Sequence, residues 1–144
     1  MIQDRLTELA IFLLRVALGL MFIAHSLLLK LVVFGLPGTA AFFGSIGLPP
    51  WLAYGVFGME ILGGVMLVLG IHARWSALAL LPIVAGAVWV HAGNGWVFTS
   101  ANGGWEYPLY LCLLCAVQAM LGDGAYALVR SAPITAPSRA IATA

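Results

Sequence analysis

Residues 9–29 read LAIFLLRVALGLMFIAHSLLL, an apolar run whose only permanently charged side chain is Arg15. A transmembrane helix needs about 20 predominantly apolar residues. The run and its flanks therefore predict a membrane-spanning helix from about Glu8 to Lys30. Because Arg15 lies inside the run and no A-x-A-like exit follows it, we expect this helix to be retained rather than cleaved as a signal peptide.

The rest of the chain has the same character. Of its 144 residues 63% are hydrophobic and 8% charged, and the mean hydropathy is +1.08. Soluble domains are about half apolar and a quarter charged. Six basic and five acidic side chains are too few to solvate the surface of a soluble protein of this size. Lipid must therefore be the main solvent, and the net charge of +1 excludes a nucleic-acid-binding surface.

Three further apolar stretches predict membrane spans, at Trp51–Ile71, Trp75–His91 and Tyr107–Leu121. With the first span they predict an all-α fold, an integral membrane four-helix bundle that occupies residues 1–130 as one domain. Residues 131–144 are rich in Pro, Ser, Ala and Thr and predict a flexible cytoplasmic tail.

The two long connections carry almost no charge. Pro37 in the first connection, Leu31 to Pro50, suits the first turn of a short helix, which we expect to lie along the membrane interface or over the mouth of the bundle. The third connection, Ala92 to Trp105, is a Gly/Asn/Trp loop typical of an interfacial aromatic belt.

The basic residues predict the orientation. Four of them fall on one side of the predicted bundle, whereas the other side has only Lys30; the four are Arg5, Arg74, Arg130 and Arg139. The positive-inside rule then places both termini in the cytoplasm and the two long loops outside.

Six titratable side chains fall within or at the ends of the predicted spans: Arg15, His25, Lys30, Glu60, His91 and Glu106. Such residues are expensive in a membrane and are functional candidates by default. From the helical rise we expect His25 to meet Glu60 and Arg15 to reach Glu60 from the cytoplasmic side. The sequence thus predicts one outward-facing polar pocket around Glu60. In the alternative interpretation Lys30 and Glu106 extend to the interface, His91 ends a helix, and Arg15–Glu60 is a structural ion pair.

Cys112 and Cys115 lie three residues apart in the fourth span, so they share a helix face. We expect them to be packing residues, as small side chains often are in membrane helices, and the alternative is a redox dithiol. Two cysteines cannot form a disulfide framework, and no set of metal ligands is present in the sequence.

Several segments together resemble the DoxX family of small bacterial membrane proteins. They are Leu13-Leu14-Arg15-Val16-Ala17-Leu18-Gly19 with Ala24-His25 and Lys30, Gly58-Met59-Glu60-Ile61-Leu62-Gly63-Gly64, Leu69-Gly70 with Arg74, and His91 with Glu106-Tyr107. The resemblance covers about Leu9 to Gly124. The chain departs from the family pattern at Ser26, where Gly is usual, and at Gly122-Asp123-Gly124-Ala125-Tyr126.

The resemblance implies a protein of the bacterial cytoplasmic membrane tied to quinone-linked redox complexes. The leading hypothesis is a quinone-linked redox subunit, or an accessory subunit of a membrane oxidoreductase complex, with Trp89, Trp96 and Trp105 lining the quinone ring and a partner supplying electrons. One alternative is a non-enzymatic scaffold for a soluble oxidoreductase. Another is a carrier of a small molecule or lipid gated by Glu60 and Arg15. A homo-oligomer is compatible with each.

Overall fold

The fold is taken from a computed structural model, which describes residues 2–132. Most of the predicted tail, residues 131–144, lies outside the described residues, and its flexibility stays a prediction.

Helices make up most of the described chain, and the fold is all-α, as predicted. They are α1 (Ile2–Ala24), the π-helix η1 (His25–Val33), α2 (Leu36–Ser45), α3 (Leu52–Leu69), α4 (Ala73–His91), the short 3₁₀ helix η2 (Ala92–Asn94) and α5 (Glu106–Leu121). The four predicted spans correspond to α1 with η1, α3, α4 and α5. The short helix predicted in the first connection is α2, with Pro37 in its first turn.

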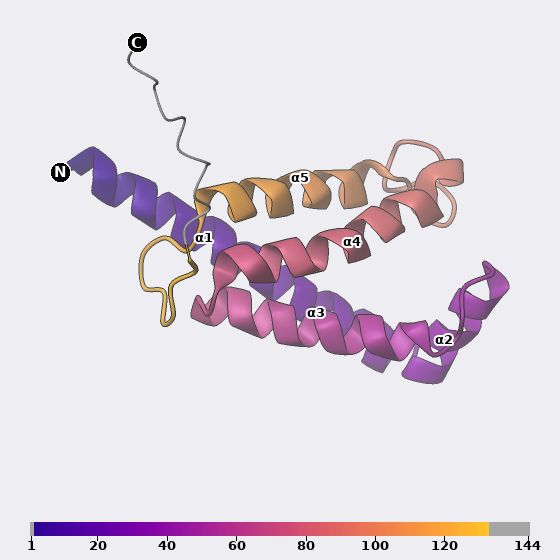
Figure 1. Cartoon of the computed structure of the whole chain (residues 1–144). Coiled ribbons are helices and arrows are strands. Elements are labelled where there is room, and N and C mark those ends of the chain that lie inside the picture. Colours follow the sequence, from indigo (N-terminus) through magenta and orange to yellow (C-terminus); the bar gives the residue numbers. More distant parts are fainter. Residues whose placement is uncertain (1, 133–144) are drawn as a thin grey trace, which may run out of the picture.

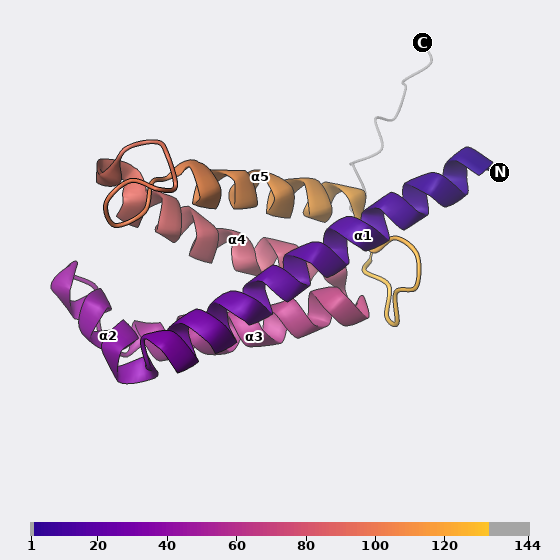
Figure 2. The ribbon, with the colours of Figure 1, turned by 180° about the vertical axis from the view of Figure 1, so that it is seen from behind.

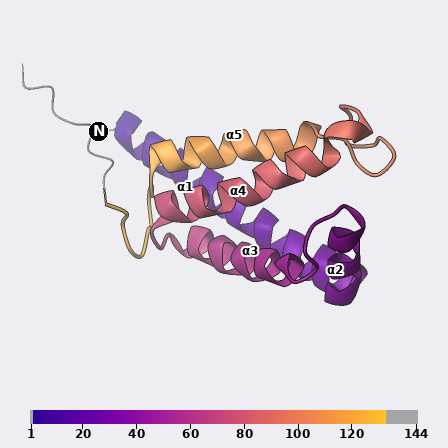
Figure 3. The same cartoon turned by 45° about the vertical axis from the view of Figure 1, so that its right-hand side comes forward.

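The four long helices form two antiparallel pairs, α1 with α3 and α4 with α5, and α3 joins the pairs by packing against α4 (Figure 1). From behind, α1 crosses the other helices obliquely (Figure 2). The N-terminus, the α3–α4 turn and the segment after α5 lie at one end, which we call the terminal end. The other end carries α2 and the α4–α5 loop and is the loop end (Figure 3).

Three helical stretches are long and apolar enough to cross a membrane, residues 2–33, 52–69 and 73–94 of the described chain. The fourth, α5, is apolar but has only 16 residues. The architecture therefore confirms an all-α integral membrane bundle.

Small residues bring α1 and α3 into close contact. A Cβ atom at Gly19 would lie 2.6 Å from the carbonyl oxygen of Gly64, and one at Gly64 would lie 2.9 Å from that of Gly19. Membrane helices use such positions to pack backbone against backbone. Around this crossing the buried core contains Leu18, Phe22 and Leu67, so the two helices are fixed at mid-height.

The end of the first span differs from the expected α-helix. From His25 to Val33 the chain forms a π-helix, and the amide of Phe34 donates to the carbonyl of Leu29, five residues earlier, at 2.9 Å. Gly35, at φ +69°, then turns the chain into α2. Most π-helices are single turns inserted in α-helices, so a nine-residue stretch needs support from its neighbours.

The segment after α5 is tied back onto the α3–α4 turn by Asp123. Its Oδ1 accepts from the amide of Ala73 at 2.8 Å and from the Ser131 hydroxyl at 2.8 Å, and its Oδ2 accepts from the Ser131 amide at 2.7 Å. Burial raises the pKa of Asp123, but these hydrogen bonds outweigh that effect and hold its pKa below the usual range. Asp123 thus supplies the carboxylate cap that α4 lacks in its own sequence.

Candidate functional site

The buried carboxylate of Glu60 on α3 is paired with groups on η1. Its Oε2 accepts a hydrogen bond from the Ser26 hydroxyl and another from the Lys30 ammonium, each at 2.6 Å. Ser26 is fully buried and Glu60 nearly so. Lys30 is therefore the cation that balances the charge of Glu60. It does not simply extend to the interface, as the alternative interpretation held.

His25 lies next to this group without bonding to Glu60. Its Nδ1 donates to the carbonyl of Met21 at 3.2 Å, and its ring stacks on Tyr107 of α5 with the centroids 5.6 Å apart. The predicted meeting of His25 with Glu60 is thus replaced by a contact that joins η1 to α5.

Arg15 is not the partner of Glu60. Its guanidinium, fully buried, donates from Nη1 to the carbonyls of Leu67 and Val68 at 3.0 and 3.3 Å, and from Nη2 to that of Ala125 at 2.9 Å. The depth estimate was misleading because the long Arg side chain reaches toward the terminal end, where the carbonyls of the last turn of α3 attract a cation.

His91 and Glu106 serve the α4–α5 loop. The Nδ1 of His91 lies 3.1 Å from the carbonyl oxygens of both Asn102 and Gly103, and the side-chain amide of Asn94 donates to the same two carbonyls. The Oε2 of Glu106 accepts from the amide of Phe98 at 3.3 Å. These contacts fold the loop onto the ends of α4 and α5.

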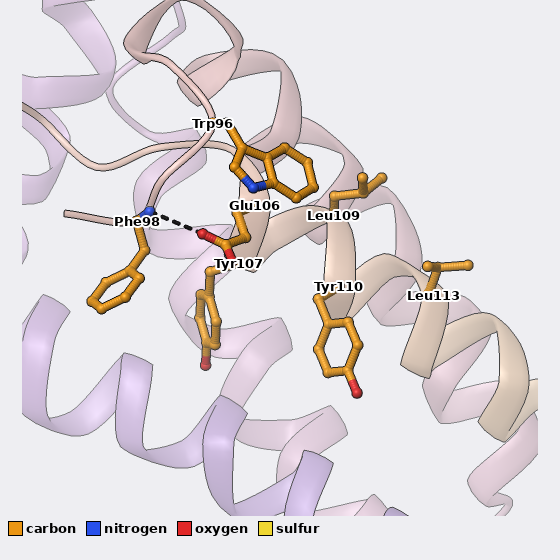
Figure 4. Close-up of a pocket in the computed structure, with 7 residues that line it drawn as sticks. All are labelled: Trp96, Phe98, Glu106, Tyr107, Leu109, Tyr110 and Leu113. Carbon is orange, nitrogen blue, oxygen red and sulfur yellow. Dashed lines mark hydrogen bonds between the residues drawn. The ribbon is translucent and has the colours of Figure 1, made fainter. Parts of the chain in front are cut away.

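An aromatic cleft lies where this loop meets α5 (Figure 4). Its volume is about 410 Å³. The residues that line it are Trp96, Phe98, Glu106, Tyr107, Leu109, Tyr110 and Leu113. Figure 4 shows the rings of Tyr107 and Tyr110 side by side below the indole of Trp96, with the Glu106 carboxylate turned toward Phe98. The cleft is mainly apolar, and its polar groups are the Glu106 carboxylate, the hydroxyls of Tyr107 and Tyr110 and the indole N–H of Trp96.

The three tryptophans predicted to line a ring-binding site have different surroundings. Trp96 lines the cleft, and Trp105 supports it edge-on with the ring centroids 4.5 Å apart. Trp89 is 63% exposed and is not among the lining residues. The aromatic walls come instead from Tyr107 and Tyr110 at the start of α5, which are one turn apart and so share a helix face.

The predicted single pocket is therefore divided into separate groups. Lys30 and Glu60 are brought together, and His25 stacks on Tyr107 instead. His91 and Glu106 hold the α4–α5 loop, and Arg15 lies at the terminal end. Ser26 was missed as a site residue. Its spacing of four from Lys30, on a span facing a buried carboxylate, is the signal that would have found it.

Cys112 and Cys115 are both free thiols of α5. Cys115 is fully buried in the core with Leu80 and Leu111 as fellow members, and Cys112 is half-buried. We predict that the two thiols serve packing and not redox chemistry, and this stays a prediction.

Comparison with known proteins gives the family. The DoxX family model matches residues 10–93, which is more than half of the chain. A Bacillus subtilis (strain 168) protein named "Putative oxidoreductase CatD" is 37% identical over 81 residues; the match covers 56% of this chain and 58% of that protein. No solved structure shows a significant match to the chain. Arg15, Ser26, Lys30 and Glu60 all lie within the matched range, and the chain belongs to the DoxX family.

Proposed function

We propose that this DoxX protein is a membrane subunit of a quinone-linked oxidoreductase complex and that the aromatic cleft holds the quinone head group. The observation that carries the proposal is the cleft itself, because its walls and volume suit a flat ring. Small-molecule sites have volumes of about 300–1,000 Å³ and apolar linings with few polar groups. The related Bacillus subtilis protein, named as an oxidoreductase, supports a redox role.

The residues of the cleft fit a planar, weakly polar head group. Trp96 and Tyr110 present faces on which a ring can stack, and Leu109 and Leu113 continue the apolar wall along α5 for a prenyl tail. When bound, a quinone supplies two-electron chemistry coupled to two protons. Glu106, held by the Phe98 amide, is placed to take up or return a proton at the edge of the cleft.

The electrons have to come from, or pass to, a partner. Among the described residues no group of three or more His, Cys, Asp and Glu side chains is arranged to hold a metal ion. The partner is a soluble oxidoreductase that reaches the cleft from the loop end, and this chain binds the quinone and exchanges its protons.

Quinone carried by the protein tests the proposal directly. We expect the wild-type protein, purified in mild detergent, to contain quinone measurable by mass spectrometry. Trp96→Ala and Tyr110→Ala should each lower the quinone content several-fold, since an aromatic contact contributes about 1 kcal/mol.

Trp75→Ala is the matched control for these variants. Trp75 is as exposed as Trp96, 48% against 50%, but it lies near the terminal end at the start of α4. Its removal should leave the quinone content unchanged. A wild-type protein without quinone, or equal losses in all three variants, would contradict the proposal.

A non-enzymatic scaffold is the second candidate function, favoured by the apolar surface of the α4–α5 loop. Val97 and Phe98 are 47% and 66% exposed at a place where a soluble oxidoreductase would dock. Replacing both residues with Ser should then abolish recovery of a soluble partner in pull-down experiments. A scaffold would also carry no quinone, so the quinone content of the purified wild-type protein distinguishes the two candidate functions.

The orientation we propose follows the basic residues. Arg5, Arg74 and Arg130 belong to the terminal end, whereas Lys30 is bound to Glu60 toward the loop end, so the positive-inside rule puts the terminal end in the cytoplasm of a bacterial inner membrane. A Cys introduced at Asn94, in a background without the native thiols, should react with impermeant reagents from outside. Labelling from the cytoplasm alone would reverse the orientation.

A further inference from the structure

We propose that the negative charge of Glu60 keeps η1 in its π-helical form, and that loss of this charge converts η1 to an α-helix and reorients α2. Glu60 is then the control element of a two-state device at the loop end. The inference does not depend on quinone binding in the aromatic cleft.

The sequence of η1 gives no reason for a π-helix. His25-Ser26-Leu27-Leu28-Leu29-Lys30-Leu31-Val32-Val33 contains neither Gly nor Pro, and its four leucines are good α-helix formers. A nine-residue π-helix is also longer than the usual single-turn insertion. The form of this segment must therefore be set by contacts with other elements.

Apolar packing contributes little to those contacts. Leu28, Val32 and Val33 are 59%, 72% and 64% exposed, and Ser26 is the only buried residue of η1. Polar contacts are concentrated on one atom instead, because Ser26 and Lys30 both donate to Oε2 of Glu60 at 2.6 Å. The Ser26 hydroxyl is fully buried and has no water as an alternative partner inside the bundle, so the Glu60 carboxylate fixes how this part of η1 faces α3.

A change in the hydrogen-bond pattern of η1 also moves α2. Only Phe34 and Gly35 separate η1 from α2, and the Thr39 hydroxyl of α2 donates to the carbonyls of Lys30 and Gly35 at 3.4 and 3.0 Å. A change from five-residue to four-residue hydrogen bonds rotates the end of η1, and α2 must follow.

Few other ionisable groups act on Glu60. On η1 these are Lys30 and His25, and from α5 Tyr107 stacks on His25; α2 carries no ionisable side chain. Neutralisation of Glu60 leaves Lys30 without its counter-ion, and an ammonium next to the end of the span can then turn toward the interface. The charge of one carboxylate thereby biases an element with two discrete forms, which is what a switch requires.

Distances between spin labels on α2 and α3 test the device. Labels at Phe42→Cys and Leu62→Cys, both exposed positions, are introduced into the full chain with Cys112→Ala and Cys115→Ala. We expect Glu60→Gln to give a displaced or second maximum in the distance distribution. Glu106→Gln, which neutralises a carboxylate of the other loop, should keep the wild-type distribution.

A folded Glu60→Gln protein with the wild-type distribution would overturn the inference. If Glu60→Gln does not fold, Lys30→Met removes the ammonium through which the Glu60 charge holds η1, and it should give the same displacement. An unchanged distribution in Lys30→Met would then overturn it. Quinone content, measured in the same preparations, reports on the cleft separately.

Discussion

The two ends of the bundle are held together in different ways. At the terminal end three segments distant in sequence are joined by hydrogen bonds: Arg15 of α1 binds carbonyls of Leu67 and Ala125, and Asp123 binds the amide of Ala73. At the loop end, the described residues form no hydrogen bond between the η1–α2 side and the α4–α5 loop, and the His25–Tyr107 stack connects them. Hydrogen bonds between distant segments thus join the terminal end, whereas a ring contact joins the two sides of the loop end.

This difference fits a division of labour. Buried groups at the terminal end satisfy helix ends, which cannot be left unpaired in a membrane. The titratable residues of the loop end bind one another or a loop, and the aromatic cleft lies there. Binding sites are commonly built where the local structure is less stable, on a scaffold that is rigid elsewhere.

Among the changes proposed here, removal of Arg15 should lower the stability of the protein most, because Arg15 joins segments of the terminal end. Arg15→Ala leaves the carbonyls of Val68 and Ala125 without a donor, whereas that of Leu67 keeps the Gly70 amide, and each unpaired buried group costs about 1–3 kcal/mol. We expect a loss of at least about 2 kcal/mol in the free energy of unfolding, measured by thermal or SDS denaturation in detergent. Arg5→Ala, an exposed residue of the same end, should be close to neutral. Equal stability of the two variants would show that the terminal end is not fixed by Arg15.

Asp123 gives the terminal end a dependence on pH. Because its pKa is lowered in the folded protein, its contribution is complete above the unfolded pKa of about 3.9 and is lost as the pH falls through the lower folded value. Asp123→Asn should cost about 1–2 kcal/mol at neutral pH and flatten the stability profile below about pH 4.

The control is Glu8→Gln, which affects an exposed ion pair with Arg130 of 3.8 Å. Such pairs contribute about 0–1 kcal/mol, so this variant should keep the acid-sensitive loss. If Asp123→Asn loses as much stability in acid as the wild type does, other groups must cause the pH dependence.

At the loop end, we expect Glu60→Gln to cost less stability than Arg15→Ala. The variant retains the shape of the side chain and a bond to Ser26 but loses the ion pair with Lys30. Polar contacts between membrane helices average about 0.6 kcal/mol and reach about 1.7 kcal/mol, so the loss in thermal stability should stay within about 2 kcal/mol. A collapse of the fold in Glu60→Gln would mean that the loop end is as essential as the terminal end.

The smallest effect is expected midway between the ends. Cys112 and Cys115 lie inside α5, and small apolar thiols contribute mainly by packing. The double change to Ala should alter the free energy of unfolding by less than about 1 kcal/mol and leave the quinone content unchanged. Loss of quinone with normal stability would instead indicate a redox dithiol close to the cleft.

The sequence predicts the helices better than it predicts their contacts. Apolar length and the Pro37 signal locate all four spans and α2, because membrane helices are decided by local composition. The pairing of Arg15 with Glu60 was wrong because helical rise gives the depth of a Cα atom and not the direction of a long side chain. The π-helix η1 could not be predicted, since its leucines favour an α-helix and its cause lies on α3.

Asp123 is a second residue whose contacts could not be predicted from the sequence. Its departure from the family pattern was visible in the sequence, yet its role depends on the amide of Ala73, which is 50 residues away. The cleft was predicted only in part: the sequence indicates Trp96 and Glu106, but Trp89 does not line the cleft, and Tyr110 does.

The shortness of α5 has a consequence for the surrounding bilayer. Sixteen residues rise about 24 Å, while the hydrocarbon layer is about 30 Å thick. Exposed Tyr110, Leu113 and Met120 still require contact with acyl chains along this face. Lipids beside α5 must therefore compress to match it, since tilting would shorten its span further, whereas lipids beside the 32-residue stretch of α1 and η1 need not. Because of this hydrophobic mismatch beside α5, the protein should prefer thinner membrane regions, and association of the α5 face with another short helix is favoured.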